Sequence, residues 1–411
     1  MLDTARQYLK ATSWPIIAAM IALMGIGIAA IGVAERADEA IAGFQARQMG
    51  FAVLGMAVFV AATVVPYQRL GRAAYVLFAL TLAMLVLVFF LPPIRACYRW
   101  INLRFILVQP SEIAKLSFII LLAWYLRYGD HYRRLRGLLV PFALTLIPMV
   151  LILKEPDLGT SLLFLPTLFF MLFMAGAKMR HLLGVLALAA VFTFLPIPRK
   201  IRADMGPIEL ADRKALAYWH SDEYIVSAAP LAIMEIHQLK RVDGWLRQGD
   251  PAVNRGKGYQ LHKSMLIIGS GGLTGRGDWN STDTFFRMLP EDQTDFIFSV
   301  IGGQWGFLGA LAVLFLYAVI FLFGIEIATI TYDPFGRLLA VGVLALLFSQ
   351  LVINVGMTMG LMPVTGMTLP MVSYGGTSLV VNCAAIGLLI NVGQRRPILL
   401  GRRPFEFQED A

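Results

Sequence analysis

The sequence predicts an all-α polytopic membrane protein with about ten transmembrane helices. Of its 411 residues, 58% are hydrophobic and only 15% are charged, and the mean hydropathy is +0.70. Soluble domains carry about 25% charged residues, so this chain has too few charges to cover a water-facing surface. Apolar runs near the roughly 20 residues that cross a bilayer recur along the chain. These observations exclude a soluble globular class.

The apolar runs divide the chain into spans and one large segment between the seventh and eighth. The predicted spans are 14–33, 50–65, 74–91, 113–128, 138–153, 158–175, 182–195, 296–323, 338–355 and 379–392. The large segment, 198–294, is too long to be a structureless loop, so we expect a folded or partly embedded cap. Within it, 208–220 is expected to be helical and 269–277 to form glycine-rich turns. We expect residues 1–411 to form a single domain.

Basic loops predict the orientation. Three clusters of Lys and Arg, in 127–137, 177–181 and 393–404, fall on one side of a ten-span chain together with the N-terminus. Positive loops face the cytoplasm, so both termini are expected there and the large segment faces outward. The net charge of +9 therefore gives no reason to expect nucleic acid. Arg99 and its neighbours break the rule by lying outside, which indicates either an anion site or weak topological pressure.

Polar residues gather at the outer ends of several spans. Glu112 and Lys115 are three residues apart on one helical face. They are either a self-neutralising pair or a pair in which Lys115 faces an anionic ligand. Asp157 follows a proline and is expected to cap the next span. Lys154 adds a positive charge, and Thr160 adds a hydrogen-bond donor, at the same edge.

Two further stretches carry candidate chemistry. Thr294 is predicted to be the N-cap of the eighth span, which would place Asp295 in its first turn as a candidate base. The segment 360–378 is apolar but broken by two prolines and four glycines, so we expect it to be buried in protein or to line a cavity. Its turn supplies free amides and hydroxyls as a phosphate or carbonyl cradle, with a generic tight turn as the alternative. The cradle residues are Ser373, Tyr374, Gly375 and Gly376.

Seven stretches, in order, resemble the SEDS family of bacterial cell-wall polymerases, which includes RodA, FtsW and SpoVE. They are RWINL, QPSEIAK, EPDLGTS, GYQLHKSMLIIGSGGLTGRG, LPEDQTDFIF, WGFLGA and MPVTGMTLPMVSYGGTSLV. The last stretch is slightly closer to RodA. The chain departs from the family at Gln293, where relatives usually carry His, and in an enlarged outer segment over 198–245.

The resemblance implies an integral-membrane glycosyltransferase of the bacterial cytoplasmic membrane that polymerises lipid II beside a class B penicillin-binding protein. Elongation or division membrane proteins are further implied partners. The family's essential aspartate corresponds to Asp295, its Glu–Lys pair to Glu112 and Lys115, its outer-loop tryptophan to Trp100 and its DLGT aspartate to Asp157.

We expect Asp295 to act as general base in an inverting transfer. The leaving pyrophosphate needs positive charge, which Lys115, Lys154, Arg99 or Arg104 would supply. A divalent cation on the pyrophosphate is an option, although no ligand cluster is evident in the sequence. Three alternatives stay open at this point. They are a division polymerase of the FtsW type, a lipid II flippase and a non-catalytic scaffold for a transpeptidase.

Overall fold

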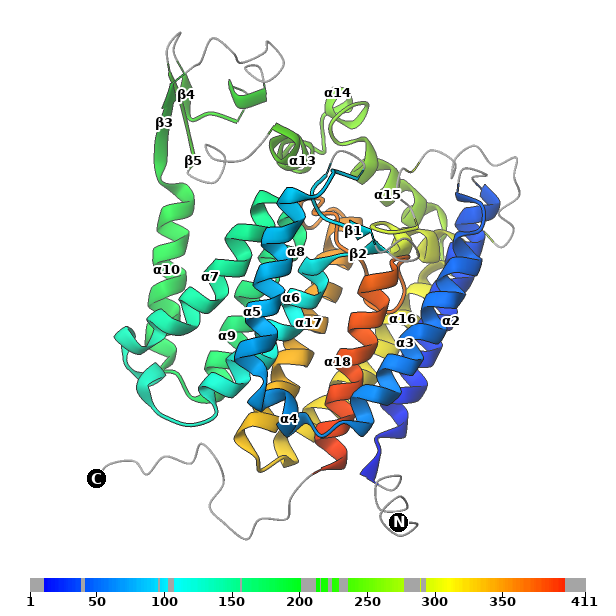
Figure 1. The fold of residues 1–411 in the computed structure, drawn as a ribbon. Coiled ribbons are helices and arrows are strands. Elements are labelled where there is room, and N and C mark those ends of the chain that lie inside the picture. Colours follow the sequence, from blue (N-terminus) through cyan, green and yellow to red (C-terminus); the bar gives the residue numbers. More distant parts are fainter. Residues whose placement is uncertain are drawn as a thin grey trace.

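The computed structural model of the chain is a bundle of long helices with smaller elements at one end (Figure 1). It describes residues 11–37, 41–94, 97–102, 107–155, 157–200, 212–214, 216–220, 224–228, 236–276, 289 and 293–395. Among the expected site residues, Arg104 lies outside these ranges.

Each predicted span corresponds to helical structure. The helices are α2 (Trp14–Ala37), α3 (Phe44–Val64), α5 (Ala74–Leu87), α6 (Pro110–Leu126), α7 (Leu139–Lys154), α8 (Leu158–Leu162) with α9 (Phe164–Ala175), α10 (Met179–Phe194), α16 (Ile297–Ile330), α17 (Pro334–Thr358) and α18 (Gly376–Gln394). In the described part of the chain, seven helical segments are long and apolar enough to cross a membrane. The α5 and α10 segments are apolar but shorter, and α6 has 17 residues and carries Glu112 and Lys115. The all-α polytopic prediction is confirmed.

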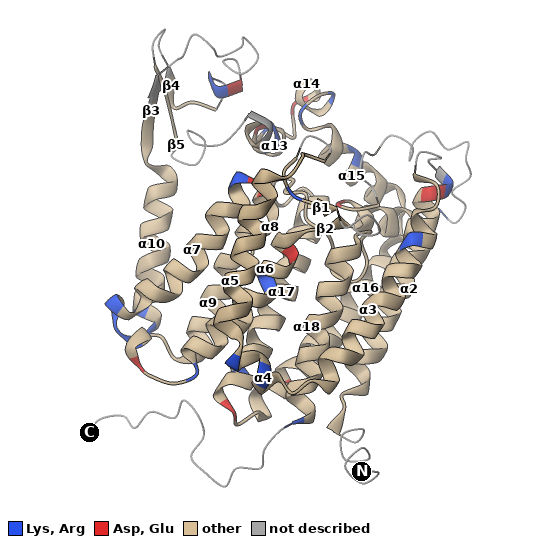
Figure 2. Cartoon of the chain, in the orientation of Figure 1, with Lys and Arg blue, Asp and Glu red and all other residues tan. Residues whose placement is uncertain are grey.

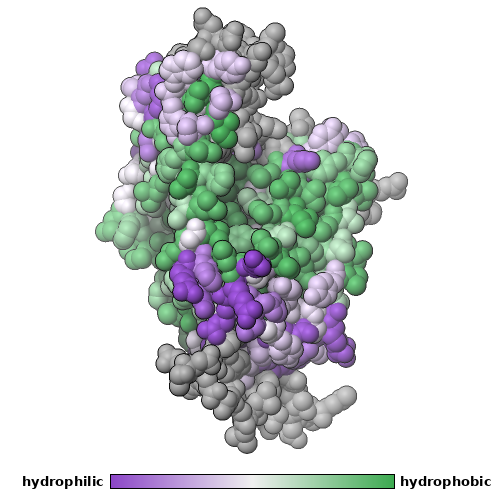
Figure 3. Space-filling model, turned by 90° about the vertical axis from the view of Figure 1, so that its left-hand side faces the viewer, coloured by the Kyte–Doolittle hydropathy of each residue, from purple (hydrophilic) through white to green (hydrophobic). Residues whose placement is uncertain are grey.

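The centre of the bundle is formed by α17 and α18. In both helices, 78% of the most apolar window is buried inside the protein, against 17% in α3 and 28% in the segment containing α7. α17 packs against α16, α9 and α6. Such enclosure suits its sequence, because a helix that is apolar on all sides is stable only when it is buried. The outer helices turn apolar side chains outward instead, and a hydrophobic band crosses the face shown in Figure 3 at mid-height. This band is the surface expected to face lipid.

Most charged residues lie at the two ends of the bundle, and few lie between them (Figure 2). The short helix α4 (Tyr67–Arg72) carries Arg69 and Arg72 at the end where α2 begins and α18 finishes. Gln394 there donates a hydrogen bond to the Thr12 hydroxyl at 2.8 Å. The segment 360–378 lies at the opposite end.

The described parts of the large segment are folded. Within the helix expected over 208–220, residues 212–214 are helical, residues 219–220 form a strand, and 208–211 and 215 lie outside the described residues. A three-stranded antiparallel sheet in the order β3-β5-β4 contains β3 (Pro196–Lys200), β4 (Trp219–His220) and β5 (Tyr224–Ala228). The helical prediction fails at β4 because pairing with β5 overrides local propensity. The sheet continues α10 outward from the bundle (Figure 1).

Three helices of the same segment cover the end of the bundle opposite the chain termini, which is the end expected to face outward (Figure 1). They are α13 (Ile236–Leu246), α14 (Pro251–Asn254) and α15 (Tyr259–Ser270). Lys257 joins them to a neighbouring stretch, since its ammonium pairs with Asp212 and, at 2.7 Å, with Asp243. A second small hairpin, β1 (Ile101–Asn102) with β2 (Leu107–Val108), leads into α6. The expected cap is therefore present as packed structure.

Candidate functional site

The segment 360–378 connects α17 to α18 without regular secondary structure up to residue 375 and ends in the first turn of α18, and most of the site is built against it. Val364, Leu369 and Val372 are buried within it. Irregular backbone at membrane depth persists only when protein covers its polar groups or it lines a cavity. The expectation of a protein-covered segment is confirmed, and the partners of its backbone identify the residues that hold it.

Gln48 of α3 holds the turn formed by residues 373–376. Its side-chain amide donates to the Ser373 carbonyl at 3.1 Å, and its carbonyl oxygen accepts from the Gly375 amide at 3.3 Å. The Tyr374 ring stacks on Phe44 of the same helix, with ring centroids 4.5 Å apart. Sequence reasoning missed Gln48, although a buried glutamine in an apolar span is itself a signal.

Gly376, the first residue of α18, must be small for this turn to form. A Cβ there would lie 2.7 Å from the Phe51 ring, which is closer than side chains tolerate. The absence of a side chain at Gly376 therefore allows α18 to start directly against α3. Three of the amides proposed as a cradle are already bonded within the protein. The Ser373 amide donates to the Leu369 carbonyl, the Tyr374 amide to the Gln293 carbonyl and the Gly375 amide to the Gln48 side chain.

Asp295 lies in a turn that is bonded to the same segment. The Ser373 hydroxyl donates to the Thr294 carbonyl at 2.5 Å, and the Tyr374 amide donates to the Gln293 carbonyl at 2.9 Å. From α17, the buried Asn354 side chain donates to the Asp295 carbonyl at 3.0 Å. These bonds hold the main chain of the turn, and the Asp295 side chain is half-buried.

The predicted capping of this helix is wrong. α16 begins at Ile297, its N-cap position is Phe296, and no side chain caps it. Thr294 therefore lies before the helix, and Asp295 lies in the preceding turn rather than the first helical turn. The physical reason is that hydrogen bonds from the distant residues Ser373 and Asn354 fix the backbone just before α16, so no local side-chain cap is needed there.

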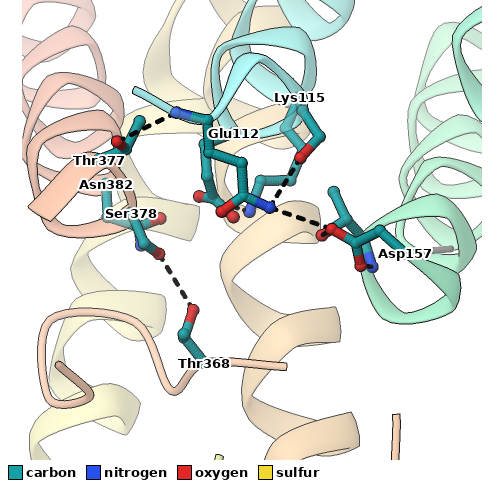
Figure 4. A network of polar contacts seen from close by, with 10 residues as sticks. Glu112, Lys115, Asp157, Thr368, Thr377, Ser378 and Asn382 are labelled. Carbon is teal, nitrogen blue, oxygen red and sulfur yellow. Dashed lines mark hydrogen bonds and ion pairs between the residues drawn. The ribbon is translucent and has the colours of Figure 1, made fainter. Parts of the chain in front are cut away.

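Glu112 and Lys115 form a buried ion pair on α6, with 2.8 Å between Lys115 Nζ and Glu112 Oε2 (Figure 4). Their side chains are 2% and 6% exposed, respectively, for Lys115 and Glu112. Burying both charges costs several kcal/mol per ion, so such a pair is poor evidence for stability and directs attention to function. Ser111 does not cap this helix, which begins at Pro110, but accepts a bond from the Gln109 side chain at 2.9 Å.

Asp157 caps α8, as predicted. One carboxylate oxygen accepts from the Thr160 amide at 3.1 Å, and the other accepts from the Thr160 hydroxyl at 2.9 Å. The second oxygen also accepts from the Gln109 side chain at 3.0 Å, which joins Asp157 to the start of α6 (Figure 4). Gln109 thereby connects two stretches that the sequence singled out separately.

Contacts with the segment 360–378 bring this polar cluster beside the Asp295 turn. The Thr377 hydroxyl accepts from the Gln109 amide at 3.3 Å and donates to the Leu107 carbonyl. Gly159 approaches the segment from α8, since a Cβ there would lie 2.8 Å from the Thr365 carbonyl oxygen. Residues from α6, α8, α16 and α18 therefore meet around one segment.

Glu155 was also missed, and it is the most unusual carboxyl group near the site. It is 0% exposed, and neither carboxylate oxygen has a hydrogen-bond partner among the described residues. Burial, and next the neighbouring Asp157 charge, raise the pKa of Glu155 to about 8, while Arg99 opposes the shift. The Arg99 Nε donates to the Glu155 carbonyl at 2.7 Å. Arg99 therefore does lie beside the site.

Two of the expected site residues, Lys154 and Trp100, are less buried than the cluster described above. Lys154 ends α7 with an exposed side chain. Trp100 is half-buried in the loop that enters β1. Among the described residues, no three His, Cys, Asp or Glu side chains are grouped to hold a metal ion.

Comparisons with known proteins cover nearly the whole chain. The FTSW_RODA_SPOVE family model, described as "Cell cycle protein", matches residues 10–397. The chain is 32% identical to the peptidoglycan glycosyltransferase RodA of Treponema pallidum, over 92% of this chain and 96% of that protein. It is also 32% identical to the probable peptidoglycan glycosyltransferase FtsW of Geobacter metallireducens, over 86% of this chain and 85% of that protein.

A solved structure agrees with these relatives. A chain of a peptidoglycan synthase complex, described as structurally coordinating polymerization and crosslinking, superposes with a TM-score of 0.72 at 27% identity. The match covers 94% of this chain and 98% of that one. Sequence and fold thus agree over the transmembrane bundle and its outer cap.

Proposed function

Because this chain belongs to the FtsW/RodA/SpoVE family, we propose that it is a peptidoglycan glycosyltransferase that polymerises lipid II at the outer face of the bacterial cytoplasmic membrane. The observation that supports this function best is the Asp295 turn. Its backbone is held by Ser373 and Asn354, while its carboxylate stays half-buried at the outer end of the bundle. A fixed carboxylate beside polar groups at membrane depth suits chemistry on a lipid-linked sugar.

In this mechanism Asp295 is the general base. The 4-hydroxyl oxygen of one sugar attacks the anomeric carbon of the lipid-linked donor, and its proton passes to the Asp295 carboxylate. The new glycosidic bond forms as the bond to the pyrophosphate oxygen breaks, and the pyrophosphate leaves on its lipid. Direct attack opposite the leaving group inverts the anomeric carbon.

Positive charge near the leaving group would stabilise the transition state. Lys115 is the strongest candidate because it is buried, and Arg99 is a second because it lies beside Glu155 and Asp157. The exposed Lys154 is the weakest of the three. Asp157, Thr160 and Trp100 remain proposed substrate contacts, as do the residues of the 373–376 turn.

Asp295→Asn is the direct test. Asn354 and Ser373 bind backbone carbonyls, so the substitution leaves both anchors in place and removes only the base. We expect polymerisation of labelled lipid II by the purified complex to fall at least about 100-fold, the range for loss of a general base. Asp250→Asn, in the outer cap, is the matched control. Near-normal strand formation by Asp295→Asn would exclude Asp295 as the base.

We further propose a RodA-like role in elongation, with a class B penicillin-binding protein as the partner and both termini in the cytoplasm. The similarity to the RodA of Treponema pallidum over most of both chains supports it. A division role is the second candidate, because the FtsW relative is equally identical. A tagged protein along the side wall supports elongation, whereas confinement to midcell supports division. Polymerisation by the purified complex also separates an enzyme from a flippase or a scaffold.

A further inference from the structure

The helix α13 and the turn that follows it are attached to segment 360–378 by three side chains. Trp245 Nε1 donates to the Gly360 carbonyl at 3.0 Å, and Gln248 Nε2 donates to the same carbonyl at 3.4 Å. Arg241 donates to the Val364 carbonyl at 3.5 Å. Arg241 and Trp245 are four residues apart in α13, so they share a helical face, and Gln248 lies in the turn just after the helix. The cap is thereby joined to the segment that holds the Asp295 turn.

Arg241 also lies next to Asp295, on the same side of Gly366. A Cβ at Gly366 would lie 3.1 Å from Arg241 Nη1 and 3.3 Å from Asp295 Oδ2. Gly366 has a φ of +74°, a conformation that favours glycine. The backbone at this point therefore has no side chain to separate the guanidinium from the carboxylate.

We propose that Arg241 is a positioning residue for Asp295, which deepens the proposed function and rests on it. The guanidinium stabilises the ionised carboxylate and keeps it oriented toward the sugar hydroxyl. Arg241 cannot itself take the proton, because a guanidinium remains charged in proteins. Both side chains are half-buried, so their attraction is screened less than that of surface charges. The outer cap would then contribute directly to catalysis.

The test compares three variants of the full-length protein in complex with its transpeptidase partner, with labelled lipid II as substrate. Arg241→Gln removes the charge and keeps an amide donor for the Val364 carbonyl. Arg241→Lys keeps the charge. Trp245→Phe is the matched control, because it breaks a bond from the same helix to the same segment without changing charge.

We expect Arg241→Gln to lower kcat about 30-fold while KM changes less than about 2-fold, since orientation of the base matters only as the proton moves. Arg241→Lys should recover much of kcat, and Trp245→Phe should stay within about 2-fold of the wild type. Wild-type kcat in Arg241→Gln overturns the inference, as does a rise in KM alone. An equal loss of kcat in Trp245→Phe also overturns it, since that outcome would mean that α13 acts only by holding segment 360–378 in place.

A second measurement covers the case in which Arg241→Gln is unstable. If the two charges interact, the effects of Arg241→Gln and Asp295→Asn on the melting temperature should not add, because each variant removes the same interaction. Additive effects overturn the inference. An inactive wild-type complex or an active Asp295→Asn variant refutes the proposed function and this inference together, whereas an active Arg241→Gln variant refutes the inference alone.

Discussion

At the scale of single residues, most charged groups of the site have a polar partner, whereas the Glu155 carboxyl group has none among the described residues. Lys115 is matched by Glu112, and Asp157 is satisfied by Thr160 and Gln109. Glu155 lacks such partners among the described residues, so the folded protein favours its protonated form. A neutral Glu155 would not compete with Asp157 for the positive charge of the neighbouring Arg99.

The raised pKa of Glu155 predicts that stability depends on pH. The unfolded chain releases this proton near pH 4.5, whereas the folded protein holds it to about pH 8. The folded state therefore binds more protons between these values, and its stability should fall as the pH rises through this window and then level off. Glu155→Gln stays neutral, so it should match the wild type near the lower limit and exceed it at the upper one by roughly 3–5 kcal/mol.

Melting temperatures in detergent over this pH range provide the measurement. Asp250→Asn is the control, because hydrogen bonds from the Ala252 amide and Arg247 hold the pKa of Asp250 below its usual value, and it does not titrate in the window. Parallel curves for the wild type and Glu155→Gln would contradict a protonated Glu155.

At the scale of elements, polar residues inside apolar helices position the irregular segments. Gln48 of α3 and Asn354 of α17 are almost fully buried, and each bonds to backbone outside its own helix. At the end of the bundle where α18 finishes, Asn391 and Arg395 do the same for α3, donating to the carbonyls that end it. Helix packing and loop conformation are therefore determined together.

Gln48→Leu tests this coupling. It leaves the Ser373 carbonyl and the Gly375 amide without their partner, at about 1–3 kcal/mol for each group. We expect faster hydrogen–deuterium exchange over 370–378 and reduced polymerisation, because Ser373 also holds the Thr294 carbonyl. Gln45→Leu, which alters a contact between α3 and α2 only, is the control. Unchanged exchange in Gln48→Leu would show that the turn of residues 373–376 is stable without the Gln48 hydrogen bonds.

At the scale of the whole molecule, the two ends of the bundle differ in charge and in structure. Basic residues lie at the end where α2 begins and α18 finishes, and the cap with segment 360–378 lies at the other (Figures 1 and 2). This polarity supports the proposed orientation, in which sugar chemistry takes place outside while the termini remain in the cytoplasm.

Accessibility of engineered cysteines measures the orientation. In a Cys97→Ser background, Gly249→Cys in the exposed cap should react with a membrane-impermeant maleimide in intact spheroplasts. Arg136→Cys, exposed at the opposite end, should react only after the membrane is opened. The remaining Cys383 is buried. The reverse pattern of labelling would invert the proposed topology.

The sequence by itself determined the helices, because crossing a bilayer demands long apolar runs that hydropathy reveals directly. It also identified Asp295, Lys115 and Asp157, since charges near membrane depth are costly and therefore conspicuous. Only the tertiary structure decided how they meet. Gln48, Asn354 and Arg241 act across long sequence separations, and the turn before α16 is held by those distant partners rather than by a local cap. Such bonds depend on which helices lie side by side, and local patterns do not record that.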